Sequence, residues 1–156
     1  MKILFLDIDG VLNNKSMDWS KEGPWTISDE AVELLNKLLD DIPDLNIVIS
    51  SSWRIVVGQK ATVDHLVKHG FRHAIRVIGS TPERESIWER GDECLDWINF
   101  RPIEMETIHN FVILDDEKDF FIAMVNPEHR KHLVLTDRKV GLTQRHIAKI
   151  KEMLCS

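Results

Sequence analysis

The feature that most constrains the fold is the stretch K-I-L-F-L-D-I-D-G-V-L at residues 2–12. Residues 3–6 form an apolar run that is too short for a typical helix and is typical of a strand buried in a parallel sheet. Because side chains alternate along an extended chain, Asp7 and Asp9 are expected to point the same way where this strand ends, and Gly10 permits a sharp turn. Open α/β sheets bind ligands at the carboxyl ends of their strands. We therefore interpret these carboxylates as a functional site.

Apolar runs and helical patterns alternate along the rest of the chain. The polar residues 13–27, which include Gly23-Pro24, are expected to form a loop or flap. Strands that alternate with helices predict a three-layer α/β fold around a parallel sheet with right-handed crossovers. With no internal repeat or linker, residues 1–156 are expected to form a single domain. The expected strands are 46–50, 75–78, 111–114 and 133–135, and the expected helices are 28–42, 60–69, 91–99, a short piece near 120, and 143–154.

The string D-I-D-G-V-L resembles the first motif of the haloacid dehalogenase superfamily, D-x-D-G-[TV]-[LV], which marks its Mg²⁺-dependent phosphatases and phosphotransferases. A D-x-D-G string also fits a calcium loop, but residues 13–18 supply neither convincing further acidic ligands nor a trailing Glu. The resemblance implies a Rossmann-like fold in which Asp7 attacks phosphorus and becomes an aspartyl phosphate. It also implies that Asp9 protonates the leaving alkoxide and then deprotonates the hydrolytic water.

The second motif follows the expected strand 46–50 in the string I-V-I-S-S-S-W-R. Superfamily members place a Ser or Thr here to hold the transferring phosphoryl group. Ser51 is the best match, with Ser50 and Ser52 as alternatives, and Ser52 is also a candidate for substrate binding. The S-x-W-R ending resembles a capless branch that is related to polynucleotide phosphatase and RNA-repair domains. Arg54 of this ending is expected to clamp a phosphate bidentately.

The third motif of the superfamily is one basic residue at a helix start, and most members have Lys there. Arg84 and Arg90 are both candidates for this position. We choose Arg90 because it stands where the expected helix 91–99 begins, in an R-G-x-E pattern that resembles the same capless branch. Arg84 is expected to bind substrate.

The fourth motif is F-V-I-L-D-D-E-K-D, where Asp115 and Asp116 follow an expected strand and Asp119 is a candidate supporting residue. Four carboxylates in one pocket repel one another by several kcal/mol at an effective dielectric constant of about 20, so a hard cation is required. The resemblance implies Mg²⁺, held by Asp7, the backbone carbonyl of Asp9, and Asp115 or Asp116. The string L-V-L-T-D-R…G-L-T near the C-terminus also matches the branch, so the resemblance spans essentially the whole chain.

The sequence also bears on the substrate. No folded cap fits into residues 13–27 or 54–89, so the site is expected to be open to a phosphate on the end of a polymer. Residues 54–90 carry seven Lys or Arg against four Asp or Glu, although the whole chain has a net charge of −6. We therefore expect a nucleotide or nucleic-acid terminal phosphate as substrate. A sugar-phosphate phosphatase and a catalytically weak binding or regulatory module are the alternatives.

The chain has no apolar run of membrane length and no signal peptide, so we expect a cytoplasmic protein without a membrane partner or an obligate protein partner.

Cysteines and aromatic residues add weaker signals. Cys94 and Cys155 have no metal-type or redox-type spacing and are expected to be free thiols. Some tryptophans are candidates for a base-stacking platform, although packing is the commoner role. They are Trp19, Trp25, Trp53, Trp88 and Trp97.

Overall fold

The computed structural model describes residues 1–86, 89–102, 104–121 and 127–155. Its centre is a five-stranded, all-parallel sheet in the order β3-β2-β1-β4-β5, which confirms the predicted α/β fold. The strands are β1 (Lys2–Leu6), β2 (Leu45–Ile49), β3 (Val77–Ser80), β4 (Asn110–Asp115) and β5 (Leu133–Leu135). The α-helices are α1 (Asp29–Asp41), α2 (Trp53–Val56), α3 (Gly58–Lys68), α4 (Arg90–Phe100) and α5 (Gln144–Cys155). Short 3₁₀ helices lie at Gly23–Trp25, Ala74–Arg76, Lys118–Phe121 and Pro127–His132.

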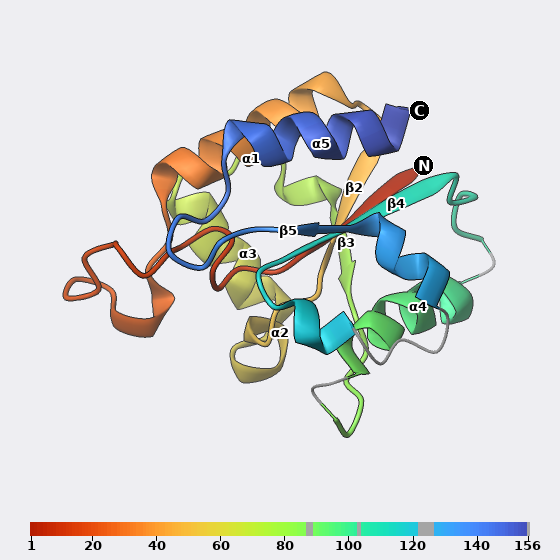
Figure 1. Ribbon diagram of the computed structural model, residues 1–156, viewed down its shortest axis with the longest axis horizontal. Coiled ribbons are helices and arrows are strands. Elements are labelled where there is room, and N and C mark those ends of the chain that lie inside the picture. The colour runs from red at the N-terminus through yellow and green to blue at the C-terminus, as the bar shows by residue number, and fades with distance from the viewer. Residues whose placement is uncertain (87–88, 103, 122–126, 156) are drawn as a thin grey trace.

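Strand β1 lies in the middle of the sheet, between β2 and β4. Successive side chains of β1 point to opposite faces of the sheet, as they do in any strand. Leu4 and Leu6 pack with α1 and α5, whereas Ile3 and Phe5 pack with α4. Figure 1 shows α1 and α5 together on one side of the sheet and α4 on the other. The apolar run is therefore buried on both faces, which fits its lack of polar side chains.

Local signals set the ends of several elements. Helix α1 begins after Ser28, whose hydroxyl accepts a hydrogen bond from the backbone N–H of Ala31 at 3.2 Å. The last turn of α3 is followed by Gly70, which has a φ of +92°. The short helix α2 was not expected from the sequence.

The third strand begins later than the sequence predicts, at Val77 rather than residue 75. The guanidinium of Arg76 donates to the backbone carbonyls of Leu39 and Ile42, at 2.7 and 3.2 Å. These bonds anchor a 3₁₀ turn beside the end of α1. Ile75 in that turn is 92% exposed, so the chain enters the sheet only after it.

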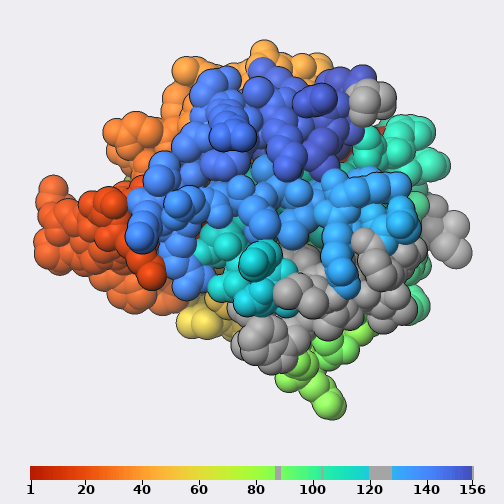
Figure 2. Space-filling view, in the orientation of Figure 1, coloured from red at the N-terminus to blue at the C-terminus, as the bar shows by residue number. Residues whose placement is uncertain are grey.

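The two intervals that could hold a cap contain little beyond the core. Residues 13–27, here called the flap, form a loop with one short 3₁₀ helix. Figure 2 shows the flap, in red and orange, projecting from one end of the molecule against the blue C-terminal segment. The described residues between β2 and α4 form α2, α3, a 3₁₀ helix and β3. No helix among the described residues is both long and apolar enough to cross a membrane.

Candidate active site

Three carboxylates converge at the carboxyl edge of the two central strands. Asp7 follows β1, and its backbone N–H continues the ladder to the carbonyl of Leu114 at 3.0 Å. Asp115 is the last residue of β4, and Asp116 comes next. Carboxylate oxygens of Asp7, Asp115 and Asp116 lie within 4.8 Å of one another. The parallel pairing of β1 with β4 therefore brings together residues that are more than a hundred positions apart in the sequence.

This cluster is buried, and its negative charge is only partly balanced by nearby arginines. Burial raises the pKa of Asp7 to about 6. Burial, reinforced by the Asp7 carboxylate, raises the pKa of Asp115 to about 8. The guanidinium of Arg90, at the start of α4, lies 3.3 Å from Asp7 and 3.1 Å from Asp115. Arg138, in the segment after β5, lies beside Asp116, so two arginines face three carboxylates and leave negative charge for a further cation to neutralise.

The residues present fit a hard divalent cation. All the side-chain ligands that the cluster offers are carboxylate oxygens, which are the ligands that Mg²⁺ prefers. Gly10 keeps room for them, because a Cβ at this position would overlap the Asp116 carboxyl group and would lie 2.8 Å from its Cβ. Gly10 also has a φ of +75°, which L side chains rarely adopt. A glycine in D-x-D-G is thus required both by the turn and by the neighbouring carboxylate.

We expect the metal-free protein to lose stability as the pH rises from about 4 to about 8. The unfolded carboxyls titrate near 3.8, whereas the pKa values of Asp7 and Asp115 in the fold are about 6 and 8. The native state therefore binds more protons across this range, and its free energy of unfolding falls with pH. Urea unfolding in chelator at pH 5 and pH 8 measures this fall.

Added Mg²⁺ should stabilise the protein more at pH 8, where it does not compete with protons. Asp115→Asn should flatten the pH dependence in chelator. Stability that rises from pH 5 to pH 8 without metal would contradict this account of the cluster.

The side chain of Asp9 is held apart from the cluster. One of its carboxylate oxygens accepts from the side-chain amide of Asn13 at 2.9 Å, and the other accepts from the indole N–H of Trp53 at 3.0 Å. Asn13 is itself fixed, because its amide oxygen accepts from the backbone N–H of Gly10 at 2.8 Å. The two Asp side chains of D-x-D-G therefore have different surroundings, one at the cluster and one beside the flap.

The sequence did not reveal the two residues that orient Asp9. Trp53 is 3% exposed and packs edge to face against Trp25, with ring centroids 4.9 Å apart. Its ring cannot turn away without disturbing that packing, so its N–H is a fixed donor. Asn13 had a weak signal, as a polar residue directly after the apolar V-L of the first motif. Of the other tryptophans, Trp97 packs on the α4 side of the core, and Trp88 lies outside the described residues.

The three serines after β2 differ in their surroundings. The backbone N–H of Ser50 continues the ladder to Leu6 at 2.9 Å, and its buried hydroxyl has no hydrogen-bond partner among the described residues. Ser51 is also buried, and its hydroxyl oxygen accepts from the backbone N–H of Trp53 at 3.3 Å. That contact leaves the hydroxyl proton of Ser51 for another acceptor. Ser52 is exposed.

Arg54 has partners other than the phosphate that we expected. Its five N–H groups donate to four backbone carbonyls and to the carboxylate of Glu93, which lies 2.7 Å away. An arginine has five such donors, so none is left for a substrate. The side chains of Arg54 and Glu93 are only 5% and 6% exposed. The ion pair between Arg54 and Glu93 thus connects the S-x-W-R string after β2 to the R-G-x-E string at the start of α4. We assign this pair a structural role. The carbonyls belong to Ser50, Ser51, Thr81 and Pro82.

We expect Arg54→Met to lower the free energy of unfolding by about 3–5 kcal/mol, because it leaves the buried Glu93 carboxylate with a backbone N–H but no guanidinium partner. Urea unfolding measures the loss. Arg72→Met is the matched control, since Arg72 is half exposed and pairs with Glu33 and Asp40 at the surface. That control should lower the free energy of unfolding far less, because solvent screens exposed ion pairs. A stable Arg54→Met protein with weakened substrate binding would restore the clamp hypothesis.

Arg84 and the other basic residues of segment 54–90 also pair with groups within the protein. The guanidinium of Arg84 contacts both oxygens of Asp96, at 2.7 and 3.0 Å, and lies 3.0 Å from Glu89. Arg84, Ser52 and Arg90 line a small cavity of about 70 Å³. The excess of basic residues in segment 54–90 is thus not an open cationic surface. Each of the segment's basic residues has a partner within the fold: Arg54, Lys60, Lys68, Arg72, Arg76, Arg84 and Arg90.

Arg138 contacts the cluster, whereas Asp119 does not belong to it. Arg138, in the T-D-R string, places its Nε 2.5 Å from the Asp116 carboxylate, and no role was expected for it from the sequence. Asp119 is exposed and is not one of the three clustered carboxylates.

Comparison with known proteins bears on the family of the chain. Neither the curated proteins nor the solved structures give a match. One family model matches residues 3–147, and its description is "HAD domain in Swiss Army Knife RNA repair proteins". The match begins at the second residue of β1, includes the other four strands, and confirms the resemblance to haloacid dehalogenase domains of the RNA-repair type. Membership of such a family suggests a phosphatase-like function. The chain thus belongs to the family of HAD domains found in Swiss Army Knife RNA repair proteins.

Proposed function

We propose that the protein is a Mg²⁺-dependent phosphomonoester hydrolase that acts through an aspartyl phosphate on a nucleotide or nucleic-acid terminal phosphate. The proposal rests on the different surroundings of the two Asp side chains in the first motif. Asp7 lies in the buried carboxylate cluster with Arg90, whereas Asp9 is held outside it by Asn13 and Trp53. These two positions suit two different tasks, because a nucleophile must reach phosphorus whereas a proton carrier must reach the leaving oxygen.

The chemistry takes two steps. In the first, a carboxylate oxygen of Asp7 attacks phosphorus, the bond from phosphorus to the leaving oxygen breaks, and Asp9 gives its proton to that oxygen. In the second, Asp9 takes a proton from a water molecule whose oxygen attacks phosphorus. The bond between phosphorus and Asp7 then breaks, which releases inorganic phosphate and restores Asp7. Arg90 and the hydroxyl of Ser51 are the proposed donors to the phosphoryl oxygens.

Asp7, Asp115, Asp116 and the backbone carbonyl of Asp9 are the proposed ligands of Mg²⁺. When bound, the ion supplies positive charge that allows an anionic phosphate to approach these carboxylates. Arg90 remains beside Asp7 and Asp115 and shares this task. Burial disfavours the charged guanidinium, but the two carboxylates outweigh it, so the pKa of Arg90 is raised above its ordinary value.

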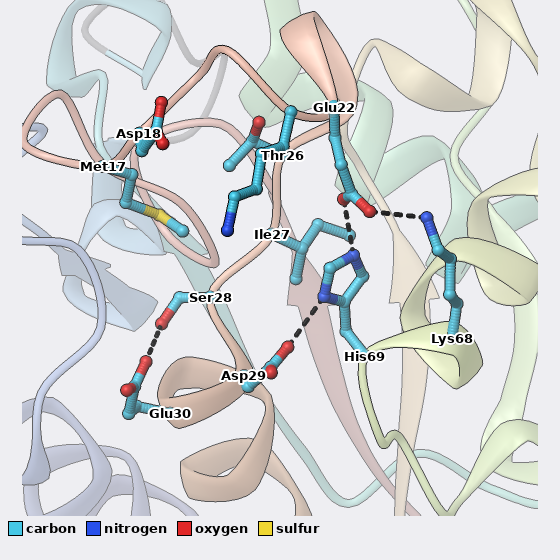
Figure 3. Close-up of a pocket in the computed structure, with 11 residues that line it drawn as sticks. Met17, Asp18, Glu22, Thr26, Ile27, Ser28, Asp29, Glu30, Lys68 and His69 are labelled. Atoms are coloured by element: carbon cyan, nitrogen blue, oxygen red, sulfur yellow. Dashed lines mark hydrogen bonds and ion pairs between the residues drawn. The ribbon is translucent and has the colours of Figure 1, made fainter.

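The substrate class is supported by the open site and by the family description. The described residues of the two cap intervals hold only the flap and core elements, so they add no folded cap over the site. The family's name refers to RNA repair proteins. A second cavity, of about 510 Å³, lies under the flap, but its lining includes Asp18, Glu22, Asp29 and Glu30 (Figure 3). Four carboxylates against two lysines, Lys21 and Lys68, leave a negative lining that disfavours an anionic ligand there.

We expect kcat/KM with Mg²⁺ to be higher for a phosphorylated oligonucleotide than for a sugar phosphate. Matched assays with 3′-phosphorylated and 5′-phosphorylated oligonucleotides, a mononucleotide and a sugar phosphate test this. Chelator should abolish all activity and Mg²⁺ should restore it, whereas Ca²⁺ should not, because its larger and looser coordination shell misplaces the reacting groups. A sugar phosphate that is preferred tenfold would overturn the substrate class, and full activity in chelator would overturn the metal.

A further inference from the structure

A cavity of about 270 Å³ opens beside Asp9, on the flap side of the site. If Asp9 protonates the leaving oxygen, the part of the substrate attached to that oxygen must start next to its carboxylate. The cavity is therefore the space for the leaving group, and this reading rests on the proposed function. Its lining comes from the first motif, the flap and the segment after β5: Asp9, Gly10, Asn13, Asn14, Lys15, Trp19 and Arg138.

Two cationic side chains line this cavity. Lys15 is exposed, and its ammonium group has no hydrogen bond or ion pair with any residue in the described ranges. Arg138 contacts Asp116 at 2.5 Å and Glu117 at 3.7 Å, but its side chain is still 48% exposed and lines the cavity. The arginines of segment 54–90 are instead held by partners within the fold. Accessible positive charge near the reaction centre thus lies on the flap side, in a protein whose net charge is −6.

The wall of the cavity is formed before any substrate binds. Three hydrogen bonds join the flap to the segment after β5. The backbone N–H of Lys15 donates to the backbone carbonyl of Arg138, and the side chains of Asn14 and Ser16 donate to the backbone carbonyls of Val140 and Lys139. Their lengths are 3.0 to 3.1 Å. Preorganised groups lose less conformational freedom on binding a ligand.

The far end of the flap is tied down as well. Figure 3 shows the ring of His69 between two carboxylates, with Glu22 at 2.8 Å and Asp29 at 2.7 Å. Lys68 also reaches Glu22 at 2.5 Å. The flap is therefore fastened at both ends, and Lys15 and Trp19 are presented from a fixed backbone.

Trp19 adds a flat aromatic group to the same wall. Its indole N–H donates to the carbonyl of Asn14 at 3.2 Å, which ties the ring to the flap, and the residue is only partly buried. An aromatic ring beside cations is the combination that binds single-stranded nucleic acid, where bases stack and phosphates pair with positive charge.

We propose that this cavity binds the nucleotide on the leaving-group side of the scissile phosphate. Lys15 and Arg138 contact the next phosphodiester along the strand, and Trp19 stacks with the base. Lys15 and Trp19 are then the residues that make the enzyme prefer a strand end over a mononucleotide.

The test compares a terminally phosphorylated trinucleotide with the matching mononucleoside monophosphate, which has the same scissile bond and no second phosphate. Lys15→Gln should lower the ratio of the two kcat/KM values about tenfold. It should also reduce the slope of log kcat/KM against log salt concentration for the trinucleotide, by the amount expected for about one lost phosphate contact. Trp19→Leu should lower the same ratio. Lys21→Gln, a change of another exposed flap lysine that lies outside the cavity, should alter the ratio less than twofold. An unchanged ratio in Lys15→Gln would overturn the proposal.

A binding measurement separates this proposal from the proposed function. The Kd of a fluorescently labelled, phosphorylated trinucleotide is measured by anisotropy on Asp7→Asn protein, with and without Lys15→Gln. Weaker binding in the double variant supports the cavity even if the wild-type protein hydrolyses none of the phosphates. Equal binding in the two proteins would contradict it even if the phosphatase activity is found.

Discussion

Asp7→Asn should lower kcat for a phosphomonoester by at least about 10³-fold, because an amide cannot replace the carboxylate as nucleophile. The loss should appear in single-turnover experiments, which report the chemical step. The fold should be retained. Burial raises the pKa of Asp7, so the charged carboxylate is a cost to the metal-free fold, and a neutral amide of the same shape removes that cost.

Two controls make this result specific. Asp64→Asn changes an exposed carboxylate that pairs with Lys60 on the surface of α3, and it should leave kcat unchanged. Urea unfolding of Asp7→Asn in chelator at pH 8 should show a free energy of unfolding no lower than that of the wild type. Near-normal turnover in Asp7→Asn would contradict the assignment of Asp7 as the nucleophile.

Asp9→Asn should also lower kcat for an oligonucleotide phosphate by at least about 10³-fold, because an amide cannot carry the proton that the leaving alkoxide needs. The loss should depend on the leaving group. Nitrophenolate leaves without protonation, so Asp9→Asn should still release about one nitrophenolate per enzyme in a rapid burst. Turnover should then be slow, because no base activates water.

Stopped-flow absorbance with p-nitrophenyl phosphate measures this burst. Trp53→Phe, which removes one of the two hydrogen bonds to Asp9, should show a smaller loss of the same kind. If Asp9→Asn slows the nitrophenolate burst as much as the first turnover of the oligonucleotide phosphate, Asp9 does not act by proton transfer to the leaving group.

The sheet and its carboxylates could be predicted because their signals are local. The apolar runs of β1 and β4 mark buried parallel strands, and parallel strands put their carboxyl ends at one edge of the sheet. Asp7, Asp115 and Asp116 each stand within two residues of such a run. The meeting of these three residues follows from strand pairing alone and needs no knowledge of loops.

The partners of Arg54 and Asp9 could not be predicted in the same way. Arg54 pairs with Glu93, which lies 39 residues away, and the choice depends on how α4 approaches the loop after β2. Both residues stand in quoted motifs, but a motif does not say that its members contact one another. Asp9 meets Trp53 across 44 residues for the same reason.

Net charge along the sequence proved a poor guide to the cationic surface. Residues 54–90 have an excess of basic side chains, yet these side chains are held by carboxylates or backbone carbonyls within the fold. Lys15 belongs to a segment, the flap, with no such excess, and tertiary structure brings it together with Arg138 at one cavity beside Asp9. Pairing in three dimensions, rather than a count, decides which charges a substrate meets.

The most direct test of the central claim is to trap the phosphorylated enzyme. Wild-type protein and Mg²⁺ are mixed with an oligonucleotide that carries a radiolabelled terminal phosphate, quenched in acid within the first turnover, and digested for mass spectrometry. We predict an acid-stable, base-labile label on the peptide that contains Asp7, and no label in Asp7→Asn. Hydrolysis of the substrate without any label on the protein, or a label on another residue, would contradict Asp7 as the nucleophile.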